Sequence, residues 1–337
     1  MSSFFVTNFG IDLGTANTLV YIPGRGIVYR EATAIAIDEE TGKVIAIGNK
    51  AKEMIDKTPS NIKAIRPLKE GVIADFTATK LMLRELLSLI FSRFKTLKPS
   101  VIVGIPLLIT EVEKRAVKES LIAAGMRDVE LVEESIASAV GSGIDISEAK
   151  GKMIVDIGGG TTEIAVLSLG GIVNTQSIKI AGDKFDEDII KFVKRKYGVE
   201  LGAKTAERLK KEIACATPLL TTISMTVKGK AIYTGLPVDV EVTSEDMEKA
   251  LRESLKKIGE EIKSTIENTS PELVSDIMDT GIMLTGGGAL IKNIDEYVYN
   301  ATRIQTFIGE NPLDSVAVGT GLMLNPKSSR KGMKINE

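Results

Sequence analysis

Two segments far apart in the chain repeat one pattern, in which an apolar run ends at an aspartate and is followed at once by glycine and threonine. Residues 9–20 read FGIDLGTANTLV and residues 155–166 read VDIGGGTTEIAV. The pattern aligns three pairs of residues: Asp12 with Asp156, Gly14 with Gly158, and Thr18 with Thr162. An apolar run, a tight turn and a second apolar run make a β-hairpin. The chain is therefore predicted to contain an internally duplicated strand-turn-strand unit.

The turns of both copies have the composition of a phosphate site. A glycine turn exposes consecutive backbone N–H groups, and without Cβ atoms the backbone can approach a phosphate closely enough to bond it. The alternative for a single turn is a tight hairpin whose aspartate accepts local N–H bonds, and two matching copies favour the phosphate interpretation. Predicted phosphate-binding residues are Gly14, Thr15, Ala16, Asn17, Gly158, Gly159, Gly160, Thr161 and Thr162. Asp12 and Asp156, at the strand ends, are predicted to hold Mg²⁺ through its waters.

Composition narrows the function classes. The chain has 337 residues and a net charge of −2, which favours two domains and gives no overall reason to expect nucleic acid. It contains no histidine, so histidine-based metal sites and Ser-His-Asp triads are excluded. The single Cys215 cannot form an internal disulfide and is predicted to be a small buried apolar residue. No secretory signal is recognisable, and the longest uncharged run, 213–227, is too short to span a bilayer, so a cytoplasmic protein is expected.

Apolar strand patterns alternate with amphipathic helical ones. VIVGIP at 101–106 precedes a helical pattern over 111–125, which precedes VELVEE at 129–134. This alternation predicts parallel βαβ units and hence an α/β fold. A helix over 244–267 is expected to begin at Ser244 without a capping box, because Met247 stands three residues later.

A third glycine cluster, LTGGGALI at 284–291, follows another apolar run and opens a helical pattern. Such a helix start is suited to an anion. None of the three glycine clusters completes GxGxxG, and GxxxxGK[ST] is absent, so the sequence support for Rossmann and P-loop sites is lacking.

In chain order, FGIDLGTANT, VIVGIP, LVEES, VDIGGGTTE, LTGGGALI and VAVGTG resemble the motifs of the actin, Hsp70 and sugar-kinase ATPase superfamily. Within it, GIDLGTANT, IRPLKEGVIADF, SIKIAGDKFDEDI and PELVSDIMDTGIMLTGGG are similar to MreB, the bacterial actin homologue family. The resemblance extends from about Gly10 to Leu324.

The resemblance implies an α/β, actin-like fold of two lobes hinged around an ATP cleft, in which each lobe is a duplicated α/β core with a smaller subdomain attached. Its expected bounds are 1–30, 73–144 and 316–337 for subdomain IA, 31–72 for IB, 145–178 and 244–315 for IIA, and 179–243 for IIB. The two Asp-Gly turns then come from opposite lobes and hold ATP or ADP with Mg²⁺.

The resemblance also implies roles for individual residues. Glu134 matches the catalytic glutamate that orients the attacking water, and Thr161 matches a threonine that helps to place it. The alternative for Glu134 is a helix-start residue favoured by the helix dipole. Adenosine contacts are expected from Glu207, Lys210, Gly286, Gly287, Gly288 and Ala289. The alternative for Glu207 and Lys210 is a surface ion pair across one helical turn.

The implied function is an ATP-hydrolysing cytoskeletal protein that polymerises head-to-tail with itself and governs cell shape or movement; the alternative is a small-molecule kinase of the same superfamily. Filaments are expected at the inner face of the cell membrane, with MreB-type paralogues or membrane proteins as further partners. The predicted contacts with anionic lipid are the basic tail residues and an apolar turn: Lys327, Arg330, Lys331, Lys334, Phe94 and Leu97. The alternatives are a solvated tail, and a turn that caps the core beneath the preceding helix.

Overall fold

The computed structural model describes residues 8–91, 99–107 and 109–324. The chain divides into two compact units. The first comprises Met1–Lys150, Leu167–Val173 and Leu313–Glu337, and the second comprises Gly151–Val166 and Asn174–Pro312. The finer division into four subdomains stays a proposal.

The sheet of the first unit has the order β10-β9-β1-β2-β3. Its strands are β1 (Asn8–Leu13), β2 (Asn17–Ile22), β3 (Gly26–Ala32), β9 (Ser100–Ile105) and β10 (Val129–Glu133). The first three form an antiparallel meander, and β9 and β10 continue it in parallel. Phe9, Ile11 and Val103 are fully buried, as expected for parallel strands with helices on both faces. The C-terminal ends of the parallel strands β1 and β9 therefore lie side by side, with Asp12 next to Gly104.

Four helices accompany this sheet: α2 (Phe76–Phe91), α3 (Glu111–Ala123), α4 (Glu134–Gly141) and α10 (Ser315–Met323). Helices α4 and α10 cross in backbone contact. A Cβ atom on Gly319 would lie 1.8 Å from the Ala137 carbonyl oxygen, and one on Gly141 would lie 1.8 Å from that of Ser315. Arg30 pairs with Asp314, the N-cap of α10, at 2.6 Å. The middle and the last residue of α4, Ala137 and Gly141, thus lie directly against α10.

A smaller three-stranded sheet follows β3, with the order β5-β4-β6. Its elements, and the short hairpin after it, are β4 (Ile35–Asp38), β5 (Val44–Ile47), α1 (Gly48–Met54), β6 (Ile62–Ile65), β7 (Leu68–Lys69) and β8 (Val72–Ile73). Its core consists of small side chains, Ala32, Ala34, Ala36 and Ala51. This allows α1 to lie close to the strands.

The sheet of the second unit has the order β13-β12-β11-β17-β18. Read in the same direction, the first sheet is β3-β2-β1-β9-β10, so each strand of one sheet has a counterpart in the other. Its strands are β11 (Lys152–Ile157), β12 (Thr162–Ser168), β13 (Gly171–Ile178), β17 (Ile282–Thr285) and β18 (Thr306–Ile308). Strand β17 is parallel to β11, as β9 is to β1. The predicted duplication and the α/β class are confirmed, and the repeat includes the two parallel strands as well as the hairpin.

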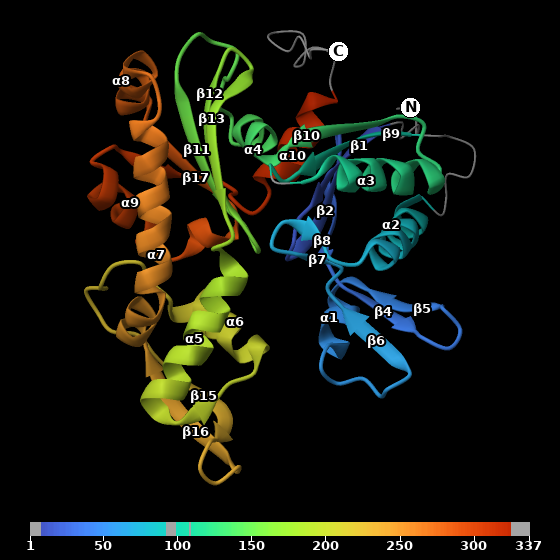
Figure 1. Ribbon diagram of the computed structural model, residues 1–337, viewed down its shortest axis with the longest axis vertical. Helices are drawn as coiled ribbons and strands as arrows, with labels where there is room; N and C mark the ends of the chain where they lie inside the picture. The colour runs from blue at the N-terminus through green and yellow to red at the C-terminus, as the bar shows by residue number, and fades with distance from the viewer. Residues whose placement is uncertain (1–7, 92–98, 108, 325–337) are drawn as a thin grey trace. The chain divides into compact units, whose positions relative to one another are not determined.

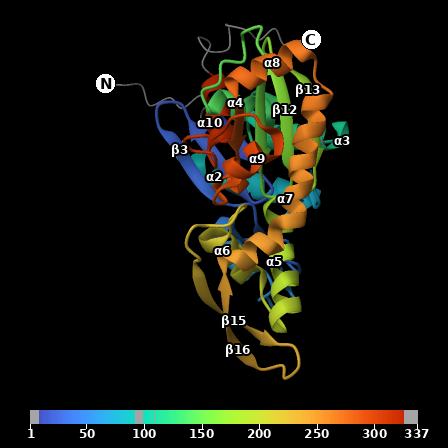
Figure 2. The same ribbon diagram turned by 90° about the vertical axis from the view of Figure 1, so that its left-hand side faces the viewer.

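The rest of the second unit is largely helical (Figures 1 and 2). Its helices are α5 (Gly182–Tyr197), α6 (Ala203–Ile213), α7 (Ser244–Glu267), α8 (Pro271–Thr280), the 3₁₀ helix η1 (Gly287–Leu290) and α9 (Ile294–Thr302). A small sheet of β14 (Val199–Glu200), β15 (Ser224–Ala231) and β16 (Pro237–Thr243) lies beside α5 and α6. Its long β15–β16 hairpin leads directly into α7 (Figure 2).

Helix α7 begins at Ser244 and ends at Glu267 as predicted, but its N-cap and its capping box differ from the prediction. Thr243, not Ser244, is the N-cap, and it forms a complete capping box with Asp246. Asp246 stands three residues after Thr243, which is the spacing that a capping box requires.

The single cysteine is buried, as the sequence predicts. Cys215 is 1% exposed and lies among apolar neighbours, with its Sγ 3.4 Å from the Ser244 carbonyl oxygen. Across the described ranges, no helix combines the length and the apolar character that crossing a bilayer requires.

Candidate nucleotide-binding site

The turn between β11 and β12 presents free backbone donors. The N–H of Gly158 donates to the Thr161 carbonyl at 2.9 Å and closes the turn. Among the described residues, the N–H groups of Gly159 and Gly160 have no acceptor. Two adjacent unused amides in a glycine turn form a concave anion site, which suits a phosphate.

Helix α5 fixes the other side of this turn. The N–H of Gly182 donates to the Gly158 carbonyl at 3.1 Å, and the N–H of Asp183 donates to the Gly159 carbonyl at 2.8 Å. The turn's carbonyls are thereby occupied by a helix start that needs acceptors for its own N–H groups. The amides of the turn are left for a ligand.

The two threonines of the turn differ in availability. Thr162 is fully buried and donates its hydroxyl to the Ile180 carbonyl at 2.6 Å. The Thr161 hydroxyl has no partner within the described part of the chain. A hydroxyl has one proton to donate, so Thr161 keeps a donor for a ligand or water, whereas the proton of Thr162 is used inside the protein.

The third glycine cluster packs directly against the same turn. A Cβ atom on Gly286, whose φ is +78°, would lie 2.4 Å from Asp156 Oδ1, and one on Gly288 would lie 2.2 Å from Ile157 Cγ2. Asp156 is 7% exposed and accepts a 3.0 Å hydrogen bond from Thr285. Residues 156–162 and 285–289, far apart in sequence, therefore form one site.

The glycine cluster does not open an α-helix as predicted. It forms the 3₁₀ turn η1, and α9 begins only at Ile294, after Asn293 in the left-handed conformation with φ 59°. The close approach of Gly286 and Gly288 to β11 replaces the helix start as the reason for three consecutive glycines.

The predicted adenosine residues of α6 make ion pairs other than the one considered from the sequence. Lys210 Nζ lies 2.9 Å from Asp186 Oδ1 and donates to the Gly182 carbonyl at 2.7 Å. Glu207 pairs with Lys211 at 2.7 Å. No sequence pattern indicated Asp186 beyond its place in the acidic run GDKFDED.

The turn between β1 and β2, in the first unit, has matching features. The Gly14 carbonyl accepts a 2.6 Å hydrogen bond from Thr33, and Thr15 Oγ1 accepts one of 3.1 Å from the Gly71 N–H. The N–H groups of Thr15 and Ala16 have no acceptor among the residues that the structure describes. This turn too leaves two adjacent amides for an anion.

Glu134 lies at the same sheet edge as Asp12. It is the first residue of α4, directly after β10. Its Cγ is 3.6 Å from the position that a Cβ would take on Gly104, and Gly104 is the β9 partner of Asp12. Glu134 thus lies beside the strand end that carries Asp12, and the space over Gly104 itself is filled by Val316, whose Cγ1 is 2.6 Å from that Cβ position.

The predicted catalytic residues belong to different units. Glu134 lies in the first unit and Thr161 in the second. The six residues predicted to contact lipid, Phe94, Leu97, Lys327, Arg330, Lys331 and Lys334, lie outside the described residues.

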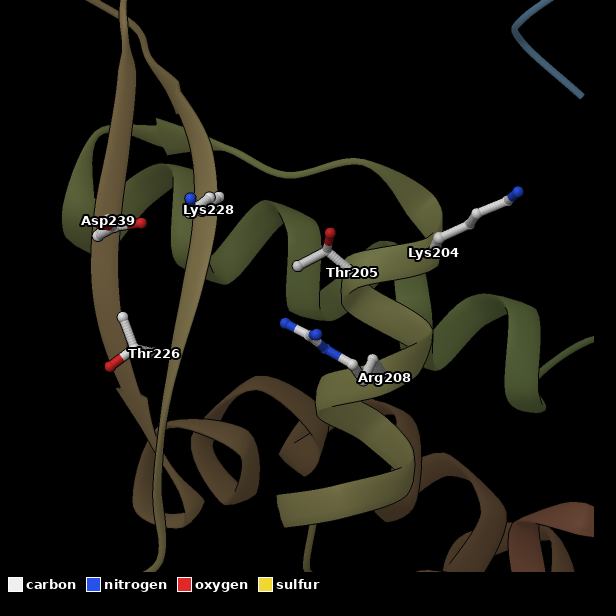
Figure 3. Close-up of a pocket in the computed structure, with 6 residues that line it drawn as sticks. All are labelled: Lys204, Thr205, Arg208, Thr226, Lys228 and Asp239. Atoms are coloured by element: carbon white, nitrogen blue, oxygen red, sulfur yellow. The ribbon is translucent and has the colours of Figure 1, made fainter. Parts of the chain in front are cut away.

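A separate hollow lies between α6 and the β15–β16 hairpin. It has a volume of about 620 Å³ and is lined by Lys204, Thr205, Arg208, Thr226, Lys228 and Asp239. Figure 3 shows Arg208 reaching from α6 toward the strands, whereas Lys204 points away from them. No residue predicted from the sequence lines this hollow, so it is distinct from the glycine turns.

Comparison with known proteins places these features in a family. The MreB/Mbl protein family matches residues 6–331. The chain is 44% identical to the cell shape-determining protein Mbl of Bacillus subtilis, over 95% of this chain and 96% of that one. It is 45% identical to the cell shape-determining protein MreB of Escherichia coli, over 95% and 94% of the two chains.

Two solved structures are also similar to this chain. A crystal structure of MreB5 of Spiroplasma citri bound to AMPPNP has a TM-score of 0.89 at 39% identity, covering 96% of this chain and 97% of that one. A MamK double helical filament has a TM-score of 0.80 at 20% identity, covering 94% and 98%, and supports the fold alone.

Proposed function

The chain belongs to the MreB/Mbl family, and on that premise we propose that it binds and hydrolyses ATP and polymerises into filaments that act in cell shape or movement. The observation that carries the nucleotide part is the glycine turn at 158–161, with two unused amides and a second glycine cluster packed behind it. Both Asp-Gly turns serve the same nucleotide in this proposal.

The donor set fits a magnesium nucleotide. Adjacent free amides hold phosphate oxygens, and the chain approaches them without Cβ atoms. Among the described residues no three carboxylates or thiols gather as a metal site. The ion would therefore be held mainly by phosphate and water, with Asp12 and Asp156 bonding its waters, which is common for Mg²⁺. Bound there, the ion would neutralise charge that develops on the phosphates.

Glu134 is the residue to orient the attacking water. With no histidine in the chain, a carboxylate is the natural group to accept the proton. Its place at the first turn of α4, beside the strand end of Asp12, keeps it close to the phosphate turn of its own unit. Thr161 keeps an unused hydroxyl proton and is the partner proposed for that water.

Relatives named as cell shape-determining proteins over 94% or more of their length favour the cytoskeletal function over the small-molecule kinase. Head-to-tail association between identical subunits, without ring closure, produces an open filament. The similar Spiroplasma citri protein was crystallised with AMPPNP and with ADP, which supports the nucleotide for this chain.

Sedimentation separates the two functions. The full chain should pellet after Mg-ATP is added, release phosphate without an added acceptor, and show filaments by electron microscopy. The matched control is the same protein in EDTA, which should stay in the supernatant. A chain that remains soluble with Mg-ATP and needs an acceptor substrate for turnover would be a kinase instead.

We also propose a peripheral position at the inner face of the cell membrane. The tail after Asn325 carries Lys327, Arg330, Lys331 and Lys334, and each basic residue near an anionic surface contributes about 1 kcal/mol. One tail is too weak to hold a monomer, whereas a filament presents many tails together and gains avidity.

A further inference from the structure

Asp186 and Lys210 form a largely buried ion pair between two helices. The pair joins α5 to α6 with Oδ1 and Nζ 2.9 Å apart, and each side chain is 14% exposed. Surface ion pairs contribute little, but a buried ammonium without a counter-charge is costly. The Lys210 head group therefore depends on Asp186 for its place.

A single residue, Gly182, connects the Lys210 ammonium to the phosphate turn by hydrogen bonds. Lys210 Nζ donates to the carbonyl of Gly182, whose own N–H donates to the Gly158 carbonyl. A Cβ atom on Gly182 would lie 3.3 Å from both Gly158 O and Lys210 Nζ. Three segments that are far apart in sequence thus converge at a glycine, with no side chain between them.

The charges around Asp186 come from both helices. Burial raises its pKa to about 6, the Lys210 ammonium opposes that rise, and the acidic Glu207 and Asp183 add to it. Loss of the Asp186 charge therefore leaves the ammonium with only the Gly182 carbonyl as its described hydrogen-bond acceptor.

We propose that Asp186 is a positioning residue for nucleotide binding: it holds Lys210, in the predicted adenosine segment, at a set distance from the phosphate turn at Gly158 and Gly159. The inference rests on the proposed function, because it assigns ATP to these residues. ATP spans both segments, so a fixed distance between them favours ATP over a ligand that occupies only the phosphate turn.

The first test compares Asp186→Asn with Asp188→Asn in the full chain. Asp188 is the matched control because it lies on the same helix, is 15% exposed and pairs with Lys184 and Ser254 on the α7 side. Affinity is measured by calorimetry for Mg-ATP and for magnesium tripolyphosphate, which lacks the nucleoside. Asp186→Asn should weaken Mg-ATP roughly tenfold, the scale for losing a supporting partner, and change tripolyphosphate less than twofold. Asp188→Asn should change neither.

The second test is made first on the unaltered chain, so it does not depend on the folding of a variant. The ratio of Mg-ATP to tripolyphosphate affinity in the unaltered chain should fall as the pH drops from 7.5 to 5, through about 6, because Asp186 gains a proton. The ratio removes only the part of the phosphate titration that the two ligands share, and the same ratio measured in Asp186→Asn at each pH corrects for the remainder. Asp186→Asn, if folded by circular dichroism, should show the low ratio at every pH.

Each outcome decides the proposal. A tenfold loss confined to Mg-ATP and to Asp186→Asn supports it. Equal losses for both ligands indicate a damaged fold and overturn it, as do unchanged Mg-ATP binding by the variant or a pH-independent ratio in the unaltered chain. If the unaltered chain binds tripolyphosphate but has no preference for Mg-ATP, the proposed function fails and this inference fails with it.

Discussion

The hydroxyl of Thr285 donates a 3.0 Å hydrogen bond to Oδ2 of Asp156, from the neighbouring parallel strand. The duplicated position beside Asp12 is Gly104, which has no side chain to donate. One carboxylate of the repeat is thus anchored by its neighbour strand, whereas beside the other that strand offers no donor side chain, and Val316 and Glu134 lie over the glycine. The two copies are similar in fold and differ in chemistry at this position.

We expect Asp12→Ala and Asp156→Ala to weaken nucleotide binding roughly tenfold or more, because each carboxylate acts on the hydrated metal. The loss should appear with Mg-ATP and nearly vanish for ATP in EDTA, as measured by calorimetry. Asp128→Ala, which removes an exposed carboxylate paired with Arg127, is the control. Unaltered Mg-ATP affinity in either variant would remove that aspartate from the metal site.

Glu134→Ala should leave ATP affinity close to that of the unaltered chain but slow phosphate release by about 10²-fold or more, the scale for losing a positioned base. Glu130→Ala, an exposed carboxylate on the preceding strand, should change neither quantity. Single-turnover phosphate release measures the effect. Turnover at the original rate would mean that Glu134 only begins the helix.

Gly286→Ala should damage both stability and nucleotide binding. The residue has φ +78°, and its new Cβ would lie 2.4 Å from Asp156 Oδ1 and from the Ile157 carbonyl oxygen. We expect a loss of about 1–3 kcal/mol in the free energy of unfolding. Gly171→Ala is the control, because nothing lies within 4 Å of its Cβ position. Urea unfolding of both variants checks this, and equal stability of the two would contradict the strain argument.

Asp246→Ala should destabilise the second unit by about 1–3 kcal/mol, because it removes the capping-box carboxylate and leaves the Tyr197 hydroxyl and the Thr243 N–H without their acceptor. The carboxylate is 2% exposed and accepts from Lys196, Tyr197 and the Thr243 N–H. Burial alone would raise the pKa of Asp246, but the hydrogen bonds from Lys196 and Tyr197 hold it below its usual value. The stabilisation is therefore present above the unfolded-state pKa and lost as the pH falls through the lower folded-state pKa.

The measurement for Asp246 is urea unfolding at pH 7 and at pH 2.5. The difference between the unaltered chain and Asp246→Ala should shrink at the lower pH. Glu245→Ala, one residue away and hydrogen-bonded only to Thr222 in the described contacts, should have an effect below about 1 kcal/mol at both. A pH-independent difference for Asp246 would show that packing, not charge, carries its contribution.

Membrane attachment by the basic tail should require anionic lipid, increase on polymerisation and decrease with salt. Liposome pelleting of the full chain is compared with a chain ending at Asn325, with and without Mg-ATP. Equal, salt-insensitive binding by both chains would exclude the tail and favour the turn with Phe94 and Leu97.

Local patterns predicted the repeated hairpins and the α/β class, because strand periodicity and glycine turns depend on neighbours in sequence. The one-residue error in the N-cap of α7 arose because Thr243 and Ser244 are both good caps, and only the register with Asp246 decides between them. The importance of Asp186 could not be predicted. Its burial and its pairing with Lys210 depend on how α5 packs against α6, which no local pattern records.

The backbone contact between Gly141 and Ser315 joins α4, which begins at Glu134, to the last helix of the described chain. During synthesis, α4 leaves the ribosome before α10 exists, so Gly141 stays uncovered until α10 follows. A chain truncated before α10 therefore lacks the close backbone contacts that α4 makes at Ala137 and Gly141.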